Sequence, residues 1–200
     1  MNLLKKGFYF LLAATVLVAC SDDDDSGPVG PIDPGGGGGS DHPLAGTSWK
    51  LTPAEGSLIV GPNATGVWWQ NSAEDVTTRA CLFDDVYTFN ADNTYAQDMQ
   101  DQTWLESAPH GVETEGCGDL VAPWNGSNAA TWSADSSTVT VVGDGAFLGL
   151  AKVTNTDESG DPADDTTTYN YTLDGNNLTI TIQGFHPEPE ATWTFKFTKQ

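Results

Sequence analysis

Basic residues, cysteine and methionine are all scarce in this chain. Its 200 residues include 7 Lys and Arg against 28 Asp and Glu, together with 3 Cys and 2 Met. A surface this acidic repels nucleic acid and anionic lipid headgroups, so both are poor partners for it. The apolar run at residues 8–18 is too short to cross a bilayer as a helix.

Short catalytic motifs are also lacking. The sequence has no Gly-x-Ser-x-Gly, phosphate-binding loop, HExxH or dinucleotide fingerprint. Acid and base side chains gather in one stretch, where Glu106, His110, Glu113 and Glu115 follow one another closely. Two of these glutamates match the paired carboxylates that a glycosidase needs. Because loop carboxylates arise by chance in so acidic a chain, we expect the protein not to be an enzyme.

The first 20 residues have the pattern of a cleavable signal peptide. Two lysines precede the apolar run, and Leu-Val-Ala-Cys at 17–20 closes it. This tetrapeptide resembles the lipobox of bacterial lipoproteins. The resemblance implies a signal peptide at 1–19, cleavage before Cys20 and lipid attached to that cysteine. The mature chain then has 7 − 2 = 5 basic and 28 acidic residues, a formal charge of −23.

An acidic and glycine-rich stretch follows the cysteine. Four aspartates at 22–25 and five glycines at 35–39 make residues 20–43 a flexible linker that cannot bury a core. The aspartates resemble the export tag of surface lipoproteins of the Bacteroidota, which implies a lipid-anchored protein exposed on the outer membrane. A plain solvated spacer is the alternative.

Residues 44–200 are enough for one domain with a single core. Cys81 and Cys117 are the cysteines left in it, and pairing is the expected outcome in an exported chain. A two-cysteine metal site is the alternative, with His110 as the nearby nitrogen ligand, although no CxxC spacing occurs.

Apolar and polar residues alternate with a period of two along most of this domain, which is typical of antiparallel strands with one buried face. Turn residues separate two of the segments into hairpins. We therefore predict an all-β domain, an antiparallel barrel or, as second choice, a sandwich. Residues 53–84 and 100–130 show no clear strand pattern and are expected to be long tryptophan-containing loops. The alternating segments are 49–51, 87–95, 139–141, 169–173, 178–182 and 193–197.

The segments 46–51, 87–95, 169–182 and 193–197 together resemble the lipocalin-like lipoproteins of the Bacteroidota. The resemblance covers most of 44–200. It implies a lipocalin-like barrel and a setting of polysaccharide utilisation.

Strand phase separates some of the seven tryptophans. Trp49 and Trp193 share the phase of the apolar faces, and Trp132 comes just before the alternating segment at 139–141, so all three are predicted to lie in the core. Trp68 and Trp69 are adjacent, so in an extended segment they point to opposite faces and at least one is exposed.

Trp104 and Trp124 fall in a predicted loop, near Glu106, His110 and Asn125. An exposed indole offers a flat apolar face to a sugar ring, and nearby polar groups supply directional hydrogen bonds to its hydroxyls. These five residues, with the adjacent tryptophan pair, are our candidate glycan-binding residues. The alternative is that the tryptophans close the barrel ends or cover the disulfide.

We expect non-catalytic binding of polysaccharide, such as a neutral β-glucan, within a glycan-uptake complex. The alternatives are a structural accessory subunit of an outer-membrane complex and a lipocalin-type binder of a small apolar ligand. No cofactor is expected. Asp157, Asp161 and Asp164 form a weak calcium candidate, with a solvated acidic turn as the alternative.

Overall fold

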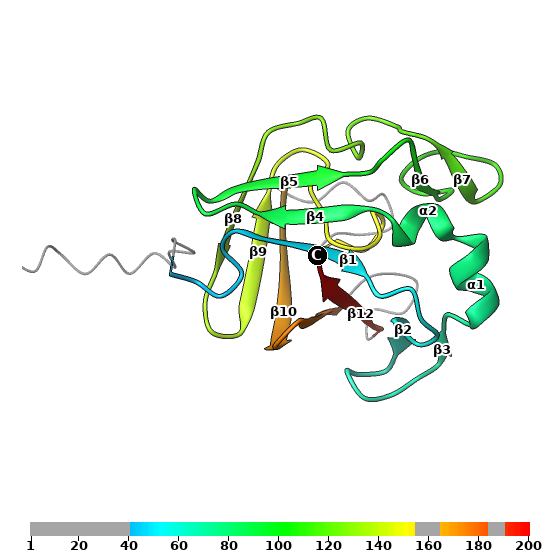
Figure 1. The fold of residues 1–200 in the computed structure, drawn as a ribbon. Helices are drawn as coiled ribbons and strands as arrows, with labels where there is room; N and C mark the ends of the chain where they lie inside the picture. Colours follow the sequence, from blue (N-terminus) through cyan, green and yellow to red (C-terminus); the bar gives the residue numbers. More distant parts are fainter. Residues whose placement is uncertain (1–40, 155–164, 184–190) are drawn as a thin grey trace, which may run out of the picture. The chain divides into compact units, whose positions relative to one another are not determined.

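The computed structural model describes residues 41–154, 165–183 and 191–200. Eight antiparallel strands of this part close into a barrel (Figure 1), which confirms the predicted fold class. The barrel strands are β1 (Thr47–Leu51), β4 (Val86–Phe89), β5 (Thr94–Asp98), β8 (Ala130–Ala134), β9 (Thr138–Val142), β10 (Thr166–Asp174), β11 (Asn177–Gln183) and β12 (Thr192–Lys199). They are hydrogen-bonded in this order, and β12 pairs with β1 to complete the ring.

The predicted hairpins form with the expected residues opposite one another. Phe89 lies across from Tyr95 in β4 and β5. Leu173 lies across from Leu178 in β10 and β11. Gly175 has φ +56° in the turn between the latter two strands, a conformation that glycine adopts without steric cost. Alternate side chains of each strand thus reach the same interior.

Further elements occur in the two stretches that were predicted to be loops, so that prediction was wrong. These elements are β2 (Leu58–Gly61), β3 (Trp69–Gln70), α1 (Ala73–Thr78), α2 (Ala80–Phe83), β6 (Gln102–Leu105) and β7 (Gly116–Asp119). None is longer than six residues, too short for a periodic pattern to stand out. They gather on one side of the barrel (Figure 1), where β2 pairs with the first half of β12 and β3 pairs with β2.

We call these six further elements the added layer, and a disulfide holds part of this layer together. Cys81 of α2 is bonded to Cys117 of β7, with their Cα atoms 5.9 Å apart. The predicted pairing is confirmed. Because β7 pairs with β6, the disulfide also fixes the β6–β7 ribbon against α2.

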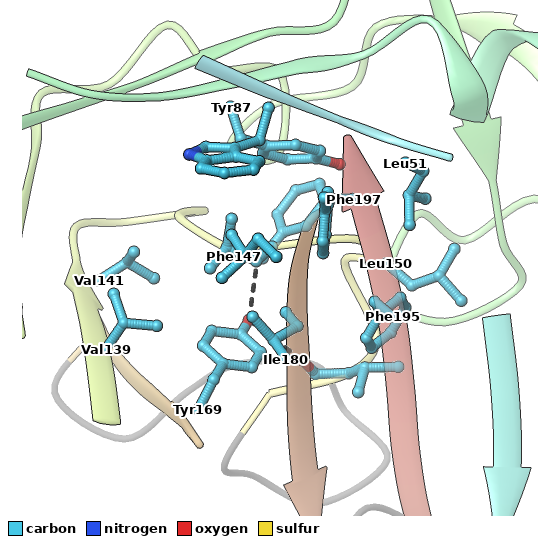
Figure 2. Packing of buried hydrophobic residues seen from close by; sticks show 14 of the residues in the cluster. Leu51, Tyr87, Val139, Val141, Phe147, Leu150, Tyr169, Ile180, Phe195 and Phe197 are labelled. Carbon is cyan, nitrogen blue, oxygen red and sulfur yellow. Dashed lines mark hydrogen bonds between the residues drawn. The ribbon is translucent and has the colours of Figure 1, made fainter. Parts of the chain in front are cut away.

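The segment at 145–154, which follows β9, fills the barrel interior, and we call it the plug. Its apolar side chains are buried, and Figure 2 shows Phe147 and Leu150 among the aromatic residues of the barrel wall. Three tyrosines of the wall bind its backbone. Tyr87 donates to the Gly149 carbonyl (3.1 Å), Tyr95 donates to the Phe147 carbonyl (2.6 Å) and Tyr169 accepts from the Leu148 amide (3.0 Å).

The tryptophan predictions for the core are confirmed at two of three positions. Trp49 and Trp132 are buried, and each indole N–H donates a hydrogen bond, to Thr47 and Asn90 respectively. Trp193 is only half-buried, because it lies near the start of β12, at the margin of the core.

Some predicted features lie outside the described residues. These are the signal peptide, Cys20, most of the linker and the calcium candidates Asp157, Asp161 and Asp164. Within the described part, no helix has the length and apolar character needed to cross a membrane.

Candidate functional site

A pocket of about 300 Å³ lies where the added layer meets the barrel. Its walls come from β2, β3, the residue between α1 and α2, the plug and the start of β12. The lining residues are Leu58, Val60, Trp68, Trp69, Arg79, Leu150, Lys152 and Trp193.

Trp68 and Trp69 form the most exposed part of this lining. Their exposed fractions are 54 % and 39 %, and the neighbouring Val67 is also 54 % exposed. The Trp68 amide donates to the Val60 carbonyl at 2.8 Å, which ties the pair to β2. The prediction that at least one is exposed is confirmed. Both are exposed because β3 extends the sheet beyond the closed ring, so neither face of β3 meets the barrel core.

Trp193 forms the inner wall of the pocket. It lies opposite Val60 in the strand register, and its ring stacks on Phe195 with centroids 6.2 Å apart and an angle of 15°. The Nζ atom of Lys152 lies 5.6 Å from the centre of the Trp193 ring. One face of the pocket is therefore aromatic and backed by the core.

Arg79 connects the pocket to β6. Its Cζ atom lies 4.3 Å from the ring centre of Trp104 and 5.8 Å from that of Trp69, distances that allow cation–π attraction. Its Nε atom is 4.0 Å from a carboxylate oxygen of Asp75. Trp104 was predicted to be an exposed loop residue, which is wrong. It is 8 % exposed in β6 and supports Arg79.

Glu106 supports the second cation. Its side chain is fully buried, and its Oε1 atom lies 2.5 Å from Lys152 Nζ. Burial raises the pKa of Glu106 to about 7, and Lys152 opposes this rise. Glu106 was predicted to face a ligand, and the structure instead places it beneath the Lys152 ammonium. Of the other glutamates in this stretch, Glu113 and Glu115 are exposed.

The other predicted ligand residues form a separate cluster. His110 accepts a hydrogen bond from the Glu106 amide at 3.0 Å, and its ring lies 5.5 Å from that of Trp124. Burial lowers the pKa of His110. Asn125 accepts from the amide and hydroxyl of Ser127, which makes it a turn residue. None of these three residues lines the pocket.

The chain matches no protein-family model and no curated protein. The described residues contain no group of three or more His, Cys, Asp or Glu placed to hold a metal ion. What the pocket offers is aromatic surface for stacking and two cationic groups at its wall.

Sequence analysis missed Arg79, Lys152 and the pocket role of Trp193. Arg79 and Lys152 are isolated in sequence, so no motif marks them. The one signal that could have marked them was the scarcity of basic residues, 7 against 28 acidic ones. The spacing of the basic residues in the sequence did not indicate that Arg79 and Lys152 would line the same pocket.

Proposed function

We propose that this protein is a lipid-anchored outer-membrane protein, exposed on the cell surface, that binds polysaccharide without hydrolysing it. The binding site is the pocket formed by Trp68, Trp69 and Trp193. The linker at 20–43 gives this domain reach from the membrane, and captured glycan is passed to partners in an uptake complex.

The observation that carries this proposal is the pair of exposed indoles beside a partly open aromatic pocket. Folded proteins seldom leave large apolar side chains side by side on the surface without a binding role. Trp68 and Trp69 are fixed by the pairing of β3 with β2, so they are ordered before a ligand arrives. A preorganised aromatic platform suits sugar rings, whose C–H faces stack on indole.

The plug argues against the lipocalin-type alternative. An eight-stranded barrel either is filled by side chains or holds one small ligand. Here Phe147, Leu148 and Leu150 occupy the interior and are hydrogen-bonded to its wall through the backbone. A small apolar ligand would have to displace them, which makes the external pocket the better site.

Affinity electrophoresis and tryptophan fluorescence with residues 41–200 test the proposal against a panel of neutral β-glucans, xylans and acidic glycans. We expect retardation by at least one glycan, reduced at least tenfold in affinity by Trp68→Ala or Trp69→Ala. Val142→Ala is the matched control, because Val142 is an exposed apolar residue on β9 away from the pocket. Failure of every glycan to bind, with copurification of an outer-membrane protein through the same two tryptophans, would favour the accessory-subunit alternative.

A further inference from the structure

The charged residues of the pocket are both basic. Arg79 and Lys152 are the charged members of its lining, and no aspartate or glutamate is among those residues. This is contrary to the composition, since the chain has 28 acidic and 7 basic residues, of which 5 basic ones remain after cleavage at Cys20. The charged side chains that line the pocket are thus opposite in sign to the net charge of the molecule, and their carboxylate partners, Asp75 for Arg79 and Glu106 for Lys152, lie outside the lining.

Both cations are held in place from beneath. The Arg79 guanidinium lies over buried Trp104, and the Lys152 ammonium contacts buried Glu106. Their side chains are 19 % and 23 % exposed, so each still reaches the pocket. Long basic side chains that are already ordered lose little entropy when an anion binds.

Each cation also lies over the ring of a pocket tryptophan. Arg79 is 5.8 Å from the Trp69 ring and Lys152 is 5.6 Å from the Trp193 ring. The carboxylate of a uronic acid is attached at the edge of the pyranose ring. A sugar stacked on the exposed part of Trp69 can therefore turn its carboxylate towards Arg79 or Lys152 of the same pocket, where a charge-assisted hydrogen bond forms.

We propose that this pocket recognises an acidic sugar unit, with Arg79 and Lys152 binding its carboxylate while the tryptophans stack on its ring. The inference rests on the proposed function and deepens it. The mature charge of −23 disfavours a continuous polyanion. The ligand class is therefore a largely neutral glycan that carries isolated uronic acid units.

The test compares two ligands that differ by one acidic unit: xylotriose, and xylotriose bearing a single glucuronic acid branch. Isothermal titration calorimetry is run with residues 41–200. We expect the acidic ligand to bind about tenfold more tightly, the effect of one charge-assisted hydrogen bond. Lys152→Met and Arg79→Gln should each remove most of this preference, measured as the ratio of the two affinities in the same variant. Lys199→Met, which deletes a charge on exposed β12 surface, should leave the preference intact.

The results of these titrations distinguish failure of this inference from failure of the proposed function. Equal affinity for the two ligands overturns the inference while glycan binding stands. Absence of binding by these ligands and by the glycan panel overturns both. A preference that survives both substitutions assigns the carboxylate to other residues and overturns the inference. The two ligands are also compared on the unsubstituted protein, so equal affinities would overturn the inference even where a substitution prevents folding.

Discussion

At the residue scale, Glu106 affects the pocket through Lys152, which its carboxylate contacts. While its carboxylate is ionised it neutralises Lys152, and when protonated it leaves the ammonium uncompensated. Burial raises the pKa of Glu106 to about 7, so this change falls at neutral pH. Arg79 and Glu115 also act on Glu106, in opposite directions, and His110, whose pKa burial lowers, accepts from its backbone amide.

We therefore expect affinity for the acidic oligosaccharide to rise as pH falls from 8 to 6. Protonation of Glu106 increases the positive charge available at Lys152, and several-fold tighter binding should result. Glu106→Gln should bind at pH 8 about as the native protein does at pH 6, with little change between. Calorimetry at pH 6, 7 and 8 measures this, with xylotriose as the control whose affinity stays flat. An acidic ligand that binds more tightly at pH 8 would contradict the prediction.

Asp85 illustrates a buried acid outside the pocket. It is fully buried, accepts one hydrogen bond from Thr103 at 2.7 Å, and burial raises its pKa to about 8. Between pH 4 and 8 the folded protein retains a proton that the unfolded chain has lost. The free energy of unfolding should consequently fall with rising pH in this window, by up to about 1.4 kcal/mol per pH unit.

Asp85→Asn removes that titration while keeping an acceptor for Thr103. We expect the variant to be more stable than the native protein at pH 8 and to show a shallower decline between pH 4 and 8. Urea denaturation across this range provides the measurement. A variant whose profile parallels the native one would show that Asp85 does not titrate as described.

At the scale of elements, the disulfide joins α2 to β7 within the added layer. Cys81 lies two residues after Arg79, and its bond to Cys117 holds α2 against the ribbon that contains Trp104. The bond closes a loop with a sequence separation of 36 residues, worth about 4 kcal/mol in the chain-entropy model. Removing it should loosen Arg79 as well as lower stability.

We expect the double variant Cys81→Ser, Cys117→Ser to unfold at a lower temperature, by on the order of 10 °C, because the loss is several kcal/mol in a domain of this size. Preference for the acidic ligand should fall in the same variant. Scanning calorimetry and titration measure the two effects. A lower melting temperature with an unchanged ligand preference would show that the bond stabilises the layer without positioning Arg79.

The plug offers a second test at this scale. Gly149 has φ +93°, and a Cβ there would lie 2.5 Å from the Phe195 ring. Gly149→Ala should cost about 2–4 kcal/mol, from overpacking together with an unfavourable φ. Gly175→Ala is the matched control, since its φ is +56° but no atom lies within 4 Å of the added Cβ. Denaturant unfolding should show a clearly smaller loss for the control.

These elements also show what the sequence could reveal. The period-two alternation in β10 and β11 predicted both strands and their turn, because a half-buried strand imposes that pattern. The plug gives no such signal: Phe147, Leu148 and Leu150 are buried without a regular period, by closure of the barrel around them. Trp104 was assigned to a loop since the four residues of β6 are too few to show a period.

At the scale of the whole molecule, charge connects composition to specificity. Net charge could be read directly from the sequence, and it led to the expectation of a neutral glycan. The positions of Arg79 and Lys152 could not be read from the sequence. These residues line the same pocket because of how the plug and the α1–α2 junction pack. The net charge predicts that the molecule repels anions at a distance, whereas we propose that the pocket binds one at contact.

The opposite effects of the acidic surface and of the two pocket cations should be visible in the salt dependence of binding. At 10 mM salt the Debye length is about 30 Å, so a long polyuronate is repelled by the acidic surface around the pocket, whereas at 0.5 M only contacts of a few Å remain effective. We expect polygalacturonate to bind far more weakly than the singly acidic oligosaccharide at low salt, and the gap to narrow at least several-fold at 0.5 M. Sodium chloride titrations of both ligands provide the measurement, with xylotriose as the neutral control. If polygalacturonate binds best at low salt, the pocket's charges dominate over the chain's net charge of −21 and the ligand is a continuous polyanion instead.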